Sequence, residues 1–145
     1  MKIFYCNIRG LKSKTTSLET VLDQTKPDII LIVETQIIGR CKIKIQNYTI
    51  NGEANRNNKS GGILIGTRKN SDIETIILKK DAKNQQIWAI IRSKTYSFRV
   101  CLVYGYPSED RISQEELEEW YVVLEEEYMK QMEYDTMIVG DFSNG

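Results

Sequence analysis

The sequence predicts a single α/β domain. Short apolar runs typical of strands alternate with two longer segments that have helical spacing of apolar residues. The unbroken run Ile29-Ile30-Leu31-Ile32-Val33 indicates a strand buried on both faces, which places it at the centre of a sheet. A length of 145 residues fits one domain, and such a domain buries roughly 70% of the surface of its unfolded chain. We therefore expect residues 1–145 to form one domain.

Eight segments are expected to form strands, each a short apolar run bounded by turn residues: 2–7, 29–33, 48–51, 63–67, 74–78, 87–92, 96–104 and 137–139. The alternation of Ile87, Ala89 and Ile91 marks one buried face. Residues 93–95 fit a tight hairpin connection, whereas residues 51–60 form a segment too polar to pack and are expected to be a loop.

Two segments are expected to form helices. In the first, Leu18, Val21 and Leu22 share one face, and Ser13 or Ser17 is the candidate cap. The second opens with the capping-box pattern Ser113-Gln114-Glu115-Glu116 and runs to about residue 131. Its apolar residues at helical spacing are expected to pack in the core: Leu117, Trp120, Tyr121, Leu124 and Tyr128. Its other glutamates are expected to form a solvated face rather than a metal site: Glu118, Glu119, Glu125, Glu126 and Glu127.

The composition excludes several types of catalytic and metal site and limits the expected cellular location. The sequence has no histidine, so these residues cannot form a Ser-His or Cys-His triad or a histidine zinc site unaided. Cys6, Cys41 and Cys101 have no paired spacing, and core thiols are favoured over metal ligands. No apolar run approaches the roughly 20 residues that span a bilayer, so no membrane partner is expected. Residues 1–7 reach a polar residue too early for a secretory signal, and we expect a cytoplasmic or nuclear location.

The charge is divided unevenly along the chain. Residues 1–70 carry twelve Lys or Arg and five Asp or Glu, a net charge of +7, whereas residues 71–145 carry −7. The candidate nucleic-acid-binding residues lie in the basic half: Arg9, Lys12, Lys14, Arg56 and Lys59. A face with this charge could contact phosphates, although solvated loops also carry charge without a ligand.

Polar residues follow four of the predicted strands. Asn7, Glu34, Tyr104 and Asp141 each stand at or directly after the end of an apolar run, where a sheet can fix a side chain and a loop leaves it accessible. Carboxylate and amide oxygens suit Mg²⁺, which shares its ligand shell with water and phosphate. Structural alternatives stay open, with Asn7 as a turn former, Tyr104 in the core, and the two carboxylates as ordinary loop residues.

Five short motifs occur in an order that resembles the endonuclease/exonuclease/phosphatase superfamily, most closely the endonuclease domain of non-LTR (LINE-type) retrotransposons. They are Asn7-Ile8-Arg9-Gly10-Leu11, Val33-Glu34-Thr35, Ser60-Gly61-Gly62-Ile63, Val103-Tyr104-Gly105-Tyr106-Pro107 and Val139-Gly140-Asp141-Phe142. The resemblance implies a DNase I-like fold, a β-sandwich flanked by helices. It also implies Mg²⁺- or Mn²⁺-dependent hydrolysis of a DNA phosphodiester, in a longer polyprotein that could include a reverse transcriptase.

The resemblance assigns a role to each of the four strand-end residues. Glu34 resembles the principal metal ligand and Asn7 the Asn that supports the metal site, while Tyr104 resembles the phosphate-contacting tyrosine. Asp141 matches the aspartate of the family's Gly-Asp-Phe-Asn motif, which orients or activates the attacking water. Ser143 stands where the motif has its phosphate-binding Asn, and Asn144 follows one position late. Asn144 is the candidate catalytic residue, and the role of the motif's Asn stays open between Ser143 and Asn144.

The family pattern continues past this motif into a half that carries a catalytic Asp-His pair. The sequence therefore predicts an incomplete DNase I-like domain, truncated at its carboxyl end, with the first sheet and part of the second. We expect it to be inactive on its own, because the histidine of the acid–base machinery is absent. The alternative is a non-catalytic remnant, or a module that keeps the fold and binds nucleic acid or protein.

Overall fold

The computed structural model describes residues 1–39, 42–56, 61–105 and 114–141. These residues form two mixed four-stranded sheets and two helices, which confirms the expected fold class. The elements in chain order are β1 (Ile3–Asn7), α1 (Thr15–Thr25), β2 (Ile29–Val33), β3 (Tyr48–Ala54), β4 (Ile63–Arg68), β5 (Glu74–Asp81), β6 (Gln86–Arg92), β7 (Ser97–Tyr104), α2 (Gln114–Met129) and β8 (Thr136–Asp141).

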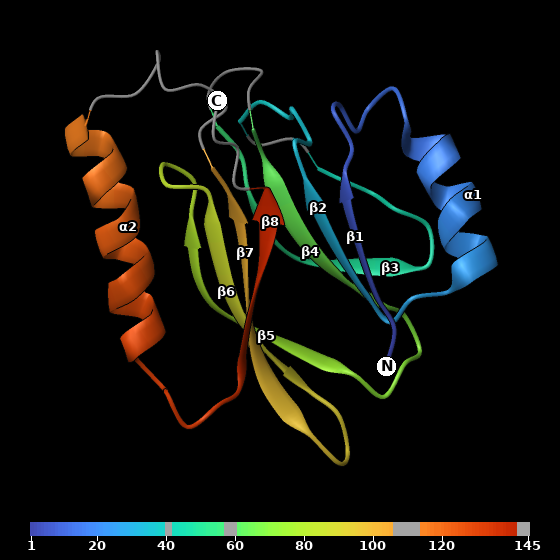
Figure 1. Cartoon of the computed structure of the whole chain (residues 1–145). Helices are drawn as coiled ribbons and strands as arrows, with labels where there is room; N and C mark the ends of the chain where they lie inside the picture. Colours follow the sequence, from blue (N-terminus) through green and yellow to red (C-terminus); the bar gives the residue numbers. More distant parts are fainter. Residues whose placement is uncertain (40–41, 57–60, 106–113, 142–145) are drawn as a thin grey trace.

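The two sheets pack face to face, and each helix covers the outer face of one sheet (Figure 1). The first sheet has the order β1-β2-β4-β3 and the second has the order β5-β6-β7-β8. Leu18 and Leu22 attach α1 to the first sheet, while Trp120 attaches α2 to the second. The largest apolar cluster lies between the sheets, so the sandwich is held by a shared core.

Strand β2 has the central position that its apolar sequence predicts. All five of its side chains are at most 1% exposed. Ile29, Leu31 and Val33 face the second sheet, whereas Ile30 and Ile32 face α1. Its neighbours are β1, which is parallel to it, and β4, which is antiparallel.

The first part of the polar stretch 51–60 is not the loop that its composition predicts, and residues 57–60 lie outside the described residues. Residues 51–54 belong to β3 and pair with β4 across a bulge between Ile50 and Gly52. A Cβ at Gly52 would lie 3.0 Å from the Ile77 side chain, so the glycine allows the second sheet to approach. The bulge and this close approach keep the strand paired where its composition alone suggests a loop.

The buried residues of the two helices, and the N-cap of the first, differ from those predicted. Lys14 is the N-cap of α1 and makes no side-chain cap bond, so neither predicted serine caps this helix; Ser113 lies outside the described residues. Three residues expected in the core are largely exposed, namely Val21, Tyr121 and Tyr128. Glu127, expected in solvent, is only 9% exposed.

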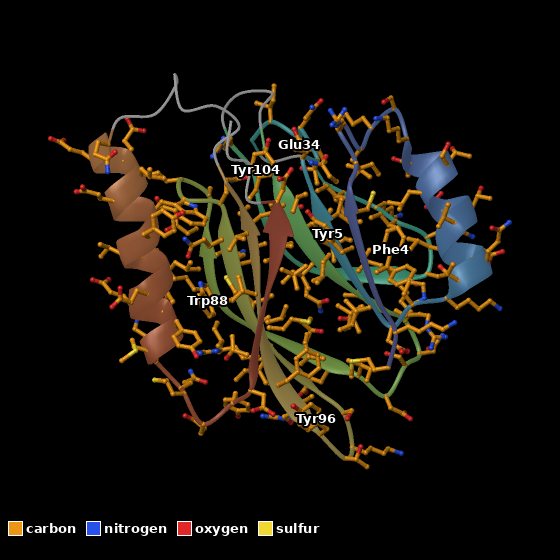
Figure 2. All side chains as sticks on the ribbon, in the orientation of Figure 1. Phe4, Tyr5, Glu34, Trp88, Tyr96 and Tyr104 are labelled. Carbon is orange, nitrogen blue, oxygen red and sulfur yellow. The ribbon has the colours of Figure 1, made fainter. Side chains whose placement is uncertain are left out.

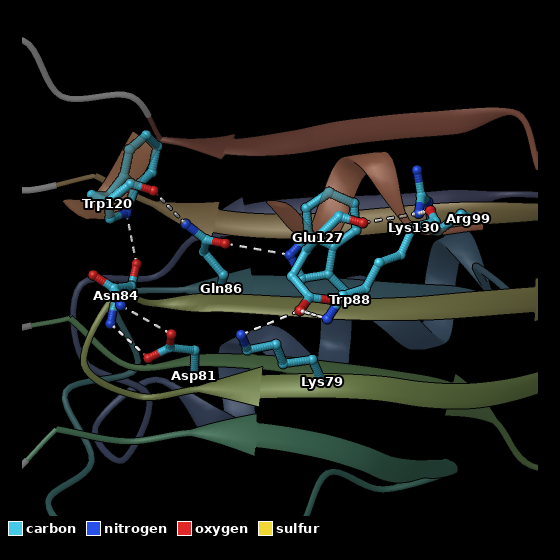
Figure 3. A network of polar contacts seen from close by, with 9 residues as sticks. All are labelled: Lys79, Asp81, Asn84, Gln86, Trp88, Arg99, Trp120, Glu127 and Lys130. Atoms are coloured by element: carbon cyan, nitrogen blue, oxygen red, sulfur yellow. Dashed lines mark hydrogen bonds and ion pairs between the residues drawn. The ribbon is translucent and has the colours of Figure 1, made fainter. Parts of the chain in front are cut away.

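Glu127 is buried because it belongs to a polar network beneath α2 (Figure 3). Its carboxylate pairs with Lys79 at 3.3 Å and with Lys130 at 2.9 Å. Burial raises the pKa of this carboxyl, but the hydrogen bonds from the two lysines outweigh it and hold the pKa below the usual value. Beside it, the buried Arg99 lies over the Trp88 ring and donates to the carbonyl oxygens of residues 127, 128 and 130. The end of α2 is therefore fixed to the second sheet.

Candidate metal and phosphate site

The four strand-end residues predicted as a site lie at one end of the sandwich. Because β1 and β2 are parallel with Asn7 opposite Val33, Asn7 and Glu34 end neighbouring strands at the same edge. In the second sheet β7 and β8 are also parallel, and Tyr104 is directly opposite Asp141. Glu34 and Tyr104 lie together at the upper end of the sheets in Figure 2.

Two hydrogen bonds join these residues across the gap between the sheets. The Asn7 amide nitrogen donates to Asp141 Oδ2 at 2.9 Å. The Tyr104 hydroxyl donates to Glu34 Oε1 at 3.0 Å. Each bond connects a residue of the first sheet with one of the second, so the site exists only when the two sheets are packed.

Glu34 is held in a backbone conformation that side chains rarely adopt. Its φ is 55°, in the left-handed region. Two hydrogen bonds hold the peptide group between Glu34 and Thr35. Gly10 N–H donates to the Glu34 carbonyl oxygen at 2.9 Å, and Thr35 N–H donates to the Gly62 carbonyl oxygen at 3.0 Å. Such strained residues are typical of functional sites, where surrounding contacts fix the conformation.

Steric contact explains why a glycine precedes Asp141. Gly140 lies opposite Val103 in the parallel ladder, and a Cβ on Gly140 would overlap the Val103 carbonyl oxygen. Gly105 N–H also donates to the Asp141 carbonyl oxygen at 2.7 Å. Close contact with β7 therefore fixes the backbone that carries the Asp141 carboxylate.

The electrostatic environment keeps the nearby phenols protonated. Burial, the hydrogen bond to Glu34 and the charges of Glu34 and Asp141 all raise the pKa of Tyr104, while the Arg56 charge lowers it. Burial raises the pKa of Tyr5 on β1, and so do the Asp141, Cys6 and Glu34 charges. Tyr104 is therefore a hydrogen-bond donor at neutral pH.

The donor set suits a hard divalent cation. The Asn7 side-chain oxygen is buried and has no hydrogen-bond partner among the described residues, although its amide nitrogen is bound to Asp141. An unpaired buried acceptor beside a carboxylate is a suitable ligand for Mg²⁺. No group of three or more His, Cys, Asp or Glu side chains arranged for a metal occurs within the described ranges.

The predicted basic residues have different positions. Lys14 donates to the carbonyl oxygens of Ile8 and Arg9 at 2.8 and 3.0 Å and so closes the loop after β1. Arg9 and Lys12 are exposed on that loop. Arg56 lies beside Gly61, where an added Cβ would be 3.3 Å from its Nη1. Lys59 and Asn144 lie outside the described residues.

Sequence reasoning missed Gln85, and it gave no role to Thr35, which it included only as part of a motif. Thr35 is 1% exposed and Gln85 is 0% exposed, and both lie beside Gly62. The Gly61-Gly62 pair was visible as a motif, but Gln85 stands in a polar turn with no pattern that marks it. Only the three-dimensional packing identifies it.

A comparison with solved structures finds the same fold. A 3'-5' exonuclease from Neisseria meningitidis has a TM-score of 0.67 at 22% identity over 98% of this chain. The endonuclease domain of TRAS1, a telomere-specific non-LTR retrotransposon, has 0.65 at 14% identity over 97%. A Neisseria 3' phosphatase bound to a product DNA hairpin has 0.69 at 18% identity over 97%.

These comparisons confirm the resemblance to the endonuclease/exonuclease/phosphatase superfamily at the level of the fold, which is DNase I-like. The chain spans 57%, 57% and 56% of the three structures, in keeping with the expected incomplete fold. Neither a family model nor a curated protein matches the sequence. No helix in the described part of the chain has the length and apolar character needed to cross a membrane.

The contact between Asn7 and Asp141 predicts a pH-dependent effect of Asn7→Asp. The variant places two carboxylates in contact, so one carboxyl has a raised pKa in the folded state. The loss of stability relative to wild type should be smallest below about pH 4 and should grow as the pH rises toward 7. Thermal unfolding at pH 4 and pH 7 measures this difference.

The matched control is Asn47→Asp at an exposed turn, where no such trend is expected. A stability loss for Asn7→Asp that is the same at both pH values would contradict the contact across the sheets.

Proposed function

We propose that these 145 residues contribute the metal-binding part of a Mg²⁺-dependent DNA endonuclease of the retrotransposon type. The observation that supports this most strongly is the pair of hydrogen bonds between the sheets, which gathers two carboxylates, an amide and a phenol from four different strands. Purely structural roles for all four residues would not require them to meet at one end of the sandwich.

Glu34 and Asn7 are the proposed metal ligands. Glu34 offers a carboxylate from a fixed backbone, and the Asn7 side-chain oxygen is an unpaired acceptor within the described part of the protein. With only these two ligands from the protein, most of the ligand shell is left to water and phosphate. When bound, Mg²⁺ or Mn²⁺ would polarise a phosphoryl oxygen.

Asp141 and Tyr104 are the proposed catalytic residues. The Asp141 carboxylate is oriented by the Asn7 amide and can accept a hydrogen bond from the attacking water, which orients that water. The Tyr104 hydroxyl has a single proton, which it donates to Glu34 in this structure; with Glu34 on the metal, that proton could instead be donated to a non-bridging phosphate oxygen as negative charge builds on it. Asn144 remains the candidate for a further phosphate contact.

DNA is the proposed partner. The fold neighbour from Neisseria with a product DNA hairpin supports a nucleic-acid ligand for this architecture. On this chain Arg9 and Lys12 project from the loop that follows Asn7, so their charges lie on the chain segment next to the site. A reverse transcriptase in a longer parent polyprotein is part of the same proposal.

The first test is metal binding by wild type and Glu34→Gln. Wild type should bind Mg²⁺ or Mn²⁺ weakly, and Glu34→Gln should abolish binding because it removes the charged ligand. Isothermal titration calorimetry measures both affinities, and Glu74→Gln, an exposed carboxylate paired with Arg92, is the control. Equal affinity in wild type and Glu34→Gln would remove the metal from this site and favour the non-catalytic alternative.

The second test is DNA binding and nicking by the 145 residues. DNA affinity should fall steeply with salt, and replacing Arg9 and Lys12 by Ala should reduce the slope of log affinity against log salt by about 0.9 for each lost phosphate contact. Lys94→Ala, on the β6–β7 hairpin at the opposite end of the sandwich, should leave the slope unchanged.

Plasmid nicking with Mg²⁺ should stay at background, because no histidine is present to serve as acid or base. Two results would contradict these expectations: a DNA affinity that does not depend on salt, and nicking that both Glu34→Gln and Asp141→Asn abolish. The second result would show that the 145 residues are an enzyme by themselves.

A further inference from the structure

The turn between β5 and β6 carries the buried side-chain amide of Gln85, which contacts Gly62 next to the candidate site. Gln85 is 0% exposed, and its side chain makes three hydrogen bonds. Its amide nitrogen donates to the carbonyl oxygens of Ala82 at 2.7 Å and Ala54 at 3.2 Å. Its side-chain oxygen accepts from the Gly62 N–H at 2.7 Å. Gln85 belongs to the second-sheet segment, whereas Ala54 and Gly62 belong to the first, so this side chain connects the two sheets.

From Gly62 the hydrogen bonds continue to the residues that follow Glu34. The Gly62 carbonyl oxygen accepts from Thr35 N–H at 3.0 Å, and the Gly61 carbonyl oxygen accepts from Gln36 N–H at 2.8 Å. These bonds fix the chain directly after Glu34, whose left-handed φ has to be maintained by its surroundings. The Gln85 side chain therefore acts on Glu34 through the Gly61-Gly62 segment.

The same residue also contacts the strand that carries the partner of Glu34. The Gln85 backbone carbonyl oxygen accepts from Tyr104 N–H at 3.0 Å. Gln85 is thus linked to both members of the Tyr104–Glu34 hydrogen bond. Its backbone binds Tyr104 directly, and its side chain is linked to Glu34 through Gly62 and Thr35. An apolar residue of similar size could fill the space, but it could not hold Gly62 and Ala54 at the same time.

We propose that Gln85 is a positioning residue that fixes the distance between Glu34 and Tyr104 by connecting the Gly61-Gly62 segment to the second sheet. The effect of Gln85 on metal affinity rests on the proposed function. The effect of Gln85 on the local order of residues 34–36 does not depend on any ligand.

The neighbouring Gln86 provides a matched control. It is also 0% exposed, but its amide donates to the Trp120 carbonyl oxygen and its side-chain oxygen accepts from the Trp88 indole N–H, on the α2 side of the sheet (Figure 3). Gln85→Met and Gln86→Met remove hydrogen bonds from adjacent buried amides at nearly constant volume. Only the first change affects the side of the turn that faces the site.

Hydrogen–deuterium exchange, measured without metal, tests the positioning directly. Gln85→Met should speed exchange at Thr35, Gln36 and Gly62 by about tenfold or more, because their hydrogen bonds lose their support. Gln86→Met should leave these amides unchanged. Unchanged exchange at all three amides in Gln85→Met would overturn the proposal, and so would equal acceleration by Gln86→Met.

Mn²⁺ titration of the same variants adds the functional readout. Gln85→Met should weaken binding by about tenfold, the lower end of the range for residues behind a metal ligand, whereas Gln86→Met should bind as wild type does. If wild type binds no metal while the exchange pattern is as expected, the proposed function fails and the positioning role stands. If wild type binds metal and Gln85→Met keeps full affinity, the role of Gln85 toward the metal ligand is overturned.

Discussion

The candidate site depends on the parallel pairing of two pairs of strands that face each other across the sandwich. β1 with β2 and β7 with β8 each bring two strand ends to the same level. The apolar core between the sheets then brings the two pairs together, so that polar residues at four strand ends can form hydrogen bonds. Loss of register in the first pair would move Asn7 relative to Glu34, and loss of register in the second would move Asp141 relative to Tyr104, even with every side chain unchanged.

Elements whose sequence pattern reflects their own burial could be predicted from the sequence. The apolar run of β2 indicates a central strand because a strand between two packed layers needs apolar residues on both faces. The strand-end residues Asn7, Glu34, Tyr104 and Asp141 were visible for a related reason, since each interrupts an apolar run with a polar group. Their meeting at one edge depends on strand direction, and the parallel pairing of β1 with β2 and of β7 with β8 provides it.

Features that depend on distant partners could not be predicted. In the sequence, Glu127 looks like any solvated helix glutamate. Its partner Lys79 lies 48 residues earlier, so the sequence pattern does not reveal their contact beneath the helix. The end of β3 has a loop-like composition, but a bulge and contact with Ile77 make it a strand. Gln85 lies in a polar turn, and only its contact with Gly62, 23 residues earlier, makes it part of the support of the site.

Mn²⁺-induced paramagnetic broadening of backbone amide NMR signals can decide whether a divalent cation binds between the ends of β1, β2, β7 and β8. We expect substoichiometric Mn²⁺ to broaden first the amides of Asn7, Glu34, Tyr104 and Asp141, with little effect on α2. Broadening that begins instead at the glutamates of α2, with these four amides unchanged, would contradict this expectation.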